Sequence, residues 1–206
     1  MESLADHLRN RGMNPDLYRV VLDEEARIAT FFLYNLSGHI VGYQHYRPEA
    51  GKERKNDPKE GRYFTYLPEG KDGVFGLDLL NHEDRTIYVT EGIFKAAVLH
   101  RLGYNAIAVL TSTPKRLKPW FRIMKATWNL VAIGDPDDAG RKLVNMVKSG
   151  FQSPFDLDEM SDEDIIELLA LESSGDDTCL SNRFRRVRSS SRSPSFRILT
   201  AYFVLI

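Results

Sequence analysis

The sequence has one cysteine, Cys179, among its 206 residues. A single thiol forms no disulfide within the chain and cannot supply the clustered thiolates of a cysteine-based zinc ribbon. The sequence also lacks the Gly-x-x-x-x-Gly-Lys-Ser/Thr pattern of a P-loop. These absences exclude a disulfide-stapled scaffold, a cysteine-based zinc ribbon and a P-loop motor such as a fused helicase would carry.

Long apolar runs are absent as well. A membrane-spanning helix needs about 18 apolar residues in a row, and the apolar segment at 198–206 is too short to cross a bilayer. The first residues are mixed and charged, which predicts that the chain carries no secretory signal peptide. We expect a cytoplasmic protein without membrane contact, and the low cysteine content fits a reducing compartment.

Neither sign of charge is in excess, since 28 Lys and Arg residues face 29 Asp and Glu residues. This balance argues against a surface coated with positive charge, although it allows a local basic groove. The charges are unevenly placed: residues 156–177 hold ten acids and no Lys or Arg, and residues 183–197 hold six Arg and no acid. The Arg/Ser-rich composition of the second segment predicts disorder.

The first part of the chain predicts a small α+β subdomain. Residues 28–34 and 40–45 form two strand patterns on either side of a turn at Ser37 and Gly38, which is typical of a β-hairpin. Before the hairpin, the spacing of apolar residues over 4–21 predicts helical structure with an interruption. Residues 62–67 predict one more short strand.

From residue 85 onward, strand and helix patterns alternate. Short apolar runs predict strands at 87–90, 106–110 and 130–133. Helical patterns predict helices at 94–102, 120–127 and 139–148. Strands separated by single helices are typical of a parallel sheet. Ser161 and Asp164 resemble a capping box and predict one further, acidic helix.

We therefore expect an α/β fold in which helices flank a parallel sheet. A hairpin-containing α+β subdomain at 1–82 precedes this sheet domain at 83–172, and an Arg/Ser-rich tail that we expect to be disordered follows at 173–206.

Acidic residues follow two of the predicted parallel strands. Glu91 comes directly after the strand at 87–90, and Asp135 and Asp137 follow the strand at 130–133. Ligand sites gather at the carboxyl ends of strands in open α/β sheets. Carboxylates from neighbouring strand ends can share a hard cation such as magnesium. The two groups together therefore predict a metal site.

Simpler explanations exist for each group of acids. Glu91 could cap the helix that follows it, because acids at a helix N-terminus gain from the helix dipole. A solvated turn could accommodate the aspartates. However, Arg141 and Lys142 bring cations to the start of the next helix, and acids for a metal beside cations for phosphate are what phosphoryl transfer requires. We favour the functional interpretation.

The string Asp135-Pro136-Asp137-Asp138-Ala139-Gly140-Arg141, one βαβα unit after Glu91-Gly92, resembles a Toprim motif. It is most similar to the Asp-x-Asp-x-Ala-Gly-Arg motif of DnaG-type and phage primases. The upstream hairpin, Arg62-Tyr63 and the segment 74–77 resemble the subdomain that precedes Toprim in these primases. The resemblance covers about residues 28–160 and implies a Toprim-like parallel sheet.

This resemblance implies a division of roles among the polar residues. Glu91, Asp135 and Asp137 would be the catalytic residues and would bind Mg²⁺ or Mn²⁺. A later acidic pair, Asp156 and Asp158, would add metal ligands. Phosphate or nucleotide contacts would come from the cations at the site, Lys95, Arg141 and Lys142.

The chain departs from the primase pattern at two points. DnaG-type primases often have an acid where this chain has Lys95, one helical turn after Glu91. Lys95 could contact a phosphate, or it could neutralise Glu91 and weaken metal binding. With one cysteine, we expect the chain to lack the zinc-binding domain that helps a primase to select its template. A primase of this kind would need help in trans, from a replicative helicase or a separate zinc-binding protein, or would be a primase core only.

A basic segment predicts contact with single-stranded DNA. Cations for the backbone and an aromatic ring for base stacking suit a single strand. The residues concerned are Lys115, Arg116, Lys118, Trp120 and Arg122. Equally, the aromatic residues of this segment could anchor a helix in the core while the cations are solvated.

Our first hypothesis is a Toprim-type primase core of phage or plasmid replication. It would join nucleoside triphosphates into short RNA primers on single-stranded DNA, by nucleotidyl transfer assisted by Mg²⁺. A Toprim nuclease and a catalytically silent, nucleic-acid-binding replication accessory protein are the alternatives.

Overall fold

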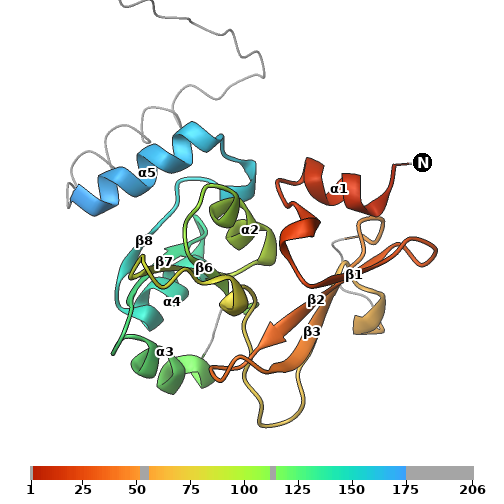
Figure 1. Ribbon diagram of the computed structural model, residues 1–206, viewed down its shortest axis with the longest axis horizontal. Helices are drawn as coiled ribbons and strands as arrows, with labels where there is room; N and C mark the ends of the chain where they lie inside the picture. The colour runs from red at the N-terminus through yellow and green to blue at the C-terminus, as the bar shows by residue number, and fades with distance from the viewer. Residues whose placement is uncertain (1, 52–55, 112–114, 175–206) are drawn as a thin grey trace, which may run out of the picture. The chain divides into compact units, whose positions relative to one another are not determined.

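The computed structural model describes residues 2–51, 56–111 and 115–174 (Figure 1). The chain divides into two units after Ile165, and all sites discussed below lie in the first unit. Helix α5 (Asp162–Ser174) begins in the first unit and ends in the second. The Arg/Ser-rich segment of the predicted tail lies outside the described residues, and the predicted domain boundaries remain a prediction.

An antiparallel sheet occupies the first part of the chain. Its strands, in spatial order, are β1 (Val20–Asp23), β2 (Ile28–Tyr34), β3 (Ile40–Tyr46) and β4 (Tyr63–Tyr66). The β2–β3 hairpin predicted from the sequence is confirmed. The helical prediction is confirmed only for α1 (Leu4–Asn10), and it is wrong at Val20 and Val21, which pair with Phe31 and Thr30 in β1.

The second part of the chain forms a sheet in which every pairing is parallel. Its spatial order is β6 (Ala106–Ala108), β5 (Thr86–Thr90), β7 (Asn129–Gly134) and β8 (Gly150–Gln152). The helices between and beside these strands are α2 (Ile93–Arg101), α3 (Lys118–Met124) and α4 (Asp138–Val147). The predicted α/β fold, a parallel sheet flanked by helices after a hairpin-containing subdomain, is confirmed. The sequence analysis does not predict the short strand β8.

Five short 3-10 helices complete the regular structure of the described residues. They are Pro15–Leu17, Pro58–Glu60, Leu77–Leu79, Lys115–Leu117 and Leu157–Glu159. None of the helices in the described part of the chain is long and apolar enough to cross a membrane.

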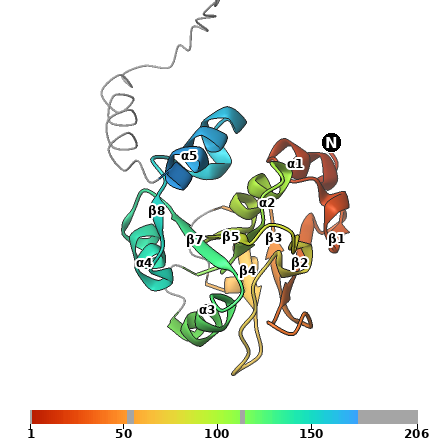
Figure 2. The ribbon, with the colours of Figure 1, turned by 60° about the vertical axis from the view of Figure 1, so that its left-hand side comes forward.

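The strand order of the parallel sheet changes direction between β5 and β7. The crossover through α2 leads from β5 outward to β6, whereas the crossover through α4 leads from β7 outward to β8 on the other side. Because such crossovers are right-handed, the two helices cover opposite faces of the sheet (Figure 2). The carboxyl ends of β5 and β7 therefore flank a topological switch point, which is the usual ligand position in open α/β sheets.

The face of the parallel sheet that α4 covers carries a hydrophobic core. Alternate residues of β5 and β7, including Ile87, Val89 and Leu130, pack there with Leu143 of α4. Trp120 belongs to the same cluster and is only 8% exposed. A short segment joins the two sheets, because Val74 pairs with Tyr34 of β2 and the next residue pairs with Ala108 of β6. The antiparallel sheet is thereby held beside the strand ends of the parallel one.

Candidate active site

The Ala-Gly-Arg part of the motif has a steric explanation at the end of β7. A Cβ atom on Gly140 would lie 2.2 Å from the backbone N and O of Asp135, and one on Gly134 would lie 2.3 Å from the carbonyl oxygen of Gly140. Only glycine at both positions lets the first turn of α4 touch the strand end. This close helix–strand approach fixes where the backbone of Asp135 lies.

Asp137 is the N-cap residue of α4. Its Oδ1 accepts a hydrogen bond from the backbone N–H of Gly140 at 2.8 Å, which satisfies one of the unpaired donors of the first turn. The Asp137 side chain is exposed. The capping explanation, which the sequence offered for Glu91, thus applies to Asp137, and the role of Asp137 as a metal ligand remains a prediction.

Gln152 on β8 supports the same loop. Its Nε2 donates to the carbonyl oxygens of Asp135 at 2.9 Å and of Asp137 at 2.7 Å. One side-chain amide therefore ties the two aspartates of the motif to the edge of the parallel sheet. Nothing in the sequence singles out Gln152, because its place beside the loop depends on the unpredicted strand β8.

Lys95 lies one helical turn after Glu91 in α2, yet its ion pairs are with other carboxylates. The Nζ atom pairs with Oδ1 of Asp135 and lies 3.4 Å from Oδ1 of Asp156. The lysine side chain is 12% exposed. Burial favours the neutral amine, but the hydrogen bond to Asp135 and the nearby carboxylates outweigh it and raise the pKa of Lys95. The ammonium is thus a fixed cation within the acidic cluster.

Glu91 has the most perturbed carboxyl group of the cluster. Burial raises its pKa to about 7, with a further contribution from the negative charge of Asp135, while Lys95 acts in the opposite direction. Its Oε1 atom is buried without a hydrogen-bond partner. Leu110, whose φ of 58° is unusual for a residue with a side chain, donates its N–H to the carbonyl oxygen of Glu91 at 2.9 Å. The backbone therefore holds Glu91 in place while one carboxylate oxygen lacks a partner.

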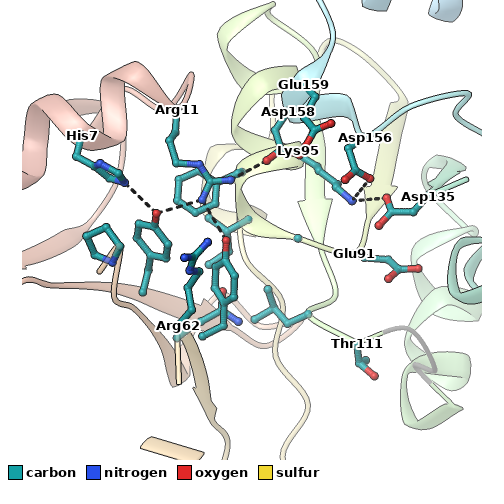
Figure 3. Close-up of a pocket in the computed structure, with 18 residues that line it drawn as sticks. His7, Arg11, Arg62, Glu91, Lys95, Thr111, Asp135, Asp156, Asp158 and Glu159 are labelled. Atoms are coloured by element: carbon teal, nitrogen blue, oxygen red, sulfur yellow. Dashed lines mark hydrogen bonds and ion pairs between the residues drawn. The ribbon is translucent and has the colours of Figure 1, made fainter. Parts of the chain in front are cut away.

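These acids line one side of a cavity of about 650 Å³. Glu91, Lys95, Asp135 and Asp156 lie on that side (Figure 3). The opposite wall comes from the N-terminal subdomain and combines cations with aromatic rings. The residues of this second wall are His7, Arg11, Tyr46, Arg62 and Tyr63. A cavity of this size accommodates a ligand as large as a nucleotide.

Arg11 connects the two walls. Its guanidinium group lies 3.7 Å from the ring centre of Phe94, hydrogen-bonds Tyr46 and Tyr63, and pairs with Oδ2 of Asp158 at 2.7 Å. Asp158 is therefore neutralised by Arg11, whereas Lys95 forms ion pairs with Asp135 and Asp156. Sequence reasoning missed Arg11, because its partner Asp158 is 147 positions away along the chain.

The donor set fits a magnesium ion whose ligand shell is completed by waters or by a substrate. In the described residues no three His, Cys, Asp or Glu side chains converge closely enough to hold an ion by themselves. Glu91 has a buried oxygen without a hydrogen-bond partner, and the ion pair of Asp135 with Lys95 is made through Oδ1. Magnesium sites in nucleotide-dependent enzymes use one or two carboxylates, waters and substrate phosphates. The site matches this arrangement and does not match a cage of protein ligands alone.

Of the three cations predicted to contact phosphate, Lys95 lines the cavity and the other two lie on the surface. Arg141 pairs with Asp138 at 2.8 Å, and Lys142 is exposed on α4; neither lines the cavity. The basic segment is likewise exposed at its cations, of which Arg116 pairs with Asp72 at 3.4 Å.

Trp120 requires a correction. Its side chain points from α3 into the hydrophobic core, as does that of Phe121, and therefore offers no ring for base stacking. The alternative explanation, an aromatic anchor for a helix, describes Trp120, and DNA contact by the exposed cations remains a prediction.

Comparisons with known proteins find similar structures but no match by sequence. No family model and no curated protein matches the chain. The chain is similar in structure to the primase fragment of the bacteriophage T7 primase-helicase protein. The TM-score is 0.59 at 19% sequence identity, and the match covers 78% of this chain and 72% of that one.

Two DnaG structures are also similar. The DnaG catalytic core has a TM-score of 0.53 at 18% identity over 80% of this chain. The DnaG primase catalytic domain bound to ssDNA has a TM-score of 0.51 at 16% identity over 79% of this chain. In both cases the chain spans 59% of the neighbour's length. The chain therefore shares the fold of primase catalytic cores.

Proposed function

We propose that the chain is a Toprim-type primase core that joins nucleoside triphosphates into short RNA primers on single-stranded DNA. One observation carries the proposal. Glu91 and Asp135 lie at the ends of β5 and β7, at the switch point of the sheet, and line one cavity in which a Glu91 oxygen is unpartnered. The fold shared with primase cores, including one bound to ssDNA, supports this choice among phosphoryl-transfer reactions.

The residues of the two walls have complementary roles in this proposal. Glu91 and Asp135 hold a divalent ion, Mg²⁺ or Mn²⁺, against the phosphates of a nucleotide. When bound, the ion neutralises charge that develops on the phosphate during nucleotidyl transfer. Arg62 adds positive charge at the opposite wall, where His7 also lies and where Tyr46 and Tyr63 offer apolar surface to a base or sugar. Arg11 holds the two walls together through Asp158.

The remaining predicted residues have supporting roles. Asp137 shapes the loop as the N-cap of α4, and Asp156 acts through Lys95. Arg141, Lys142 and the exposed cations Lys115, Arg116, Lys118 and Arg122 contact the template backbone outside the cavity. The similarity to a phage primase fragment favours phage or plasmid replication. A replicative helicase or a zinc-binding protein would then act in trans.

A primer-synthesis assay tests the proposal. The protein is incubated with mixed single-stranded DNA templates, labelled ribonucleotides and Mg²⁺, and the products are separated by length. We expect short products that depend on template and ribonucleotides. The variant Asp135→Ala should lose this synthesis, whereas Asp138→Ala should retain it, because the Asp138 side chain is 80% exposed and pairs only with Arg141 in the described structure. Synthesis by folded Asp135→Ala protein would contradict the proposal.

A catalytically silent replication accessory protein is the second candidate. The observation that favours it is the Lys95 ammonium, which neutralises Asp135 and Asp156 within the cluster. Such a protein would bind single-stranded DNA but make no product with any template. Labelled single strands incubated without ribonucleotides also detect a nuclease, since cleavage then appears in the absence of synthesis.

A further inference from the structure

Lys95 occupies a position at which a second cation would be expected. Sites that transfer phosphoryl or nucleotidyl groups often hold two metal ions about 4 Å apart, bridged by carboxylates. In this chain the ammonium of Lys95 pairs with Asp135 and lies 3.4 Å from Asp156, and the lysine side chain is 12% exposed. The protein thus supplies a covalently attached cation to two of its own acids (Figure 3).

We propose that the Lys95 ammonium takes one of two cation positions in this site, so that the chain binds a single divalent ion, at Glu91 and Asp135. This inference rests on the proposed function, because it concerns the same carboxylates. It assigns to Lys95 the role of a positioning residue that sets the number of metal ions, where the sequence had suggested a phosphate contact or the neutralisation of Glu91.

The distribution of partners among the acids supports a single ion. Arg11 neutralises Asp158, and the Gly140 N–H occupies one oxygen of Asp137. Lys95 occupies one oxygen each of Asp135 and Asp156. Glu91 takes part in none of these ion pairs, and its buried Oε1 has no hydrogen-bond partner in the described structure. A divalent ion there would meet Glu91 and the second oxygen of Asp135.

Charge also opposes a second ion beside Lys95. A cation placed between Asp135 and Asp156 would lie within a few ångströms of the ammonium, and like charges so close together in a partly buried site repel each other strongly. Lys95 would have to leave both carboxylates to make room. Removal of its charge, with no change in the acids, should therefore open a second position.

Counting bound Mn²⁺ tests the proposal without any measurement of activity. Free Mn²⁺ is measured by electron paramagnetic resonance during titration of each protein with Mn²⁺ alone. We expect one bound ion per wild-type chain and two per Lys95→Met chain. Lys95→Arg keeps the charge and should bind one ion. Lys142→Met removes an equal charge from the exposed face of α4, and it too should bind one.

Several results would overturn the proposal. They are a wild-type chain that binds two ions or none, and a Lys95→Met chain that binds the same number as the wild type. Circular dichroism establishes that each variant is folded. If Lys95→Met does not fold, Lys95→Gln replaces it, because the glutamine amide can still donate a hydrogen bond to Asp135 or Asp156 and so support folding. The expected count is again two ions, since the positive charge is removed.

The outcome is separable from that of the proposed function. The titration contains no template and no nucleotide, so a failure of primer synthesis leaves the ion count unchanged. Conversely, primers made by a wild-type protein that binds two ions would support the proposed function and refute the role of Lys95.

Discussion

The Nε2 atom of Gln152 lies 2.9 Å from the carbonyl oxygen of Asp135, and this hydrogen bond links the edge strand β8 to the candidate active site. The same nitrogen also reaches the carbonyl oxygen of Asp137. The backbone of Asp135, a candidate catalytic residue, is therefore held in part by a residue on the edge strand.

Gln152→Ala should strongly reduce primer synthesis while it lowers the free energy of unfolding only slightly. The lost hydrogen bonds loosen the Asp135 loop, and each contributes about 1 kcal/mol to folding at most for so exposed a side chain. Misplacement of a catalytic group by about 1 Å can cost about 100-fold in rate, so we expect synthesis to fall at least tenfold. Asn145→Ala, which removes an exposed amide from α4, is the control. Equal activity of the two variants would contradict this role for Gln152.

Gly140→Ala should destabilise the protein, because its Cβ would lie 2.2 Å from the backbone of Asp135. Helix α4 would have to move away from the strand end, at a cost of about 2 kcal/mol or more. Gly92→Ala is the matched control, since no atom lies within 4 Å of a Cβ there and its φ is −122°. Urea denaturation compares the two. Similar losses in the free energy of unfolding would refute the steric explanation of the motif.

Glu91→Gln should stabilise the metal-free protein at pH 8. The folded-state pKa of Glu91, about 7, lies above the usual value of 4.5 for this group, so the folded protein loses stability as pH rises between these values and Glu91 ionises. The gain at pH 8 should be about 1 kcal/mol after allowance for solvent screening of a half-buried group. It should shrink at pH 4.5. A variant no more stable than the wild type at pH 8 would argue against this strain at the site.

His100 should make stability fall in mild acid. Its Nε2–H donates to the carbonyl oxygen of Ala106 at 2.8 Å, and its Nδ1 accepts from Tyr18, so the ring is neutral. Burial lowers its pKa below the usual 6.5. The unfolded state then binds more protons, so the stabilisation is complete above pH 6.5 and is lost as pH falls through the lower, folded-state pKa. Urea denaturation between pH 5 and 8 should show a steeper loss for the wild type than for His100→Gln; parallel curves would contradict this.

The sequence predicts those features of the fold that local patterns determine. The apolar runs before Glu91 and Asp135 mark β5 and β7, and Ser161 does cap α5 by accepting from the N–H of Asp164. The helical prediction is wrong at Val20 and Val21, because pairing with β2 makes them a strand despite their helical spacing. Strand β8 is too short to leave a pattern, and it begins at a glycine.

The candidate site was predictable only in part, for the same reason. The carboxylates stand out because acids follow strand ends, but their partners come from distant segments. The ion pair of Arg11 with Asp158 joins the end of α1 to the 3-10 helix Leu157–Glu159. Trp120 looks suited to base stacking from the sequence, because the burial of its ring depends on how α3 packs and leaves no local pattern.

The central claim is that Glu91 and Asp135 jointly hold a divalent ion against a nucleotide. Crystals grown with Mn²⁺ and a nucleoside triphosphate test it most directly, through the anomalous scattering of manganese. The account predicts one anomalous peak, in contact with both carboxylates and with nucleotide phosphate, while Lys95 remains on Asp135 and Asp156. A nucleotide bound elsewhere, or an ion that contacts neither Glu91 nor Asp135, would contradict it.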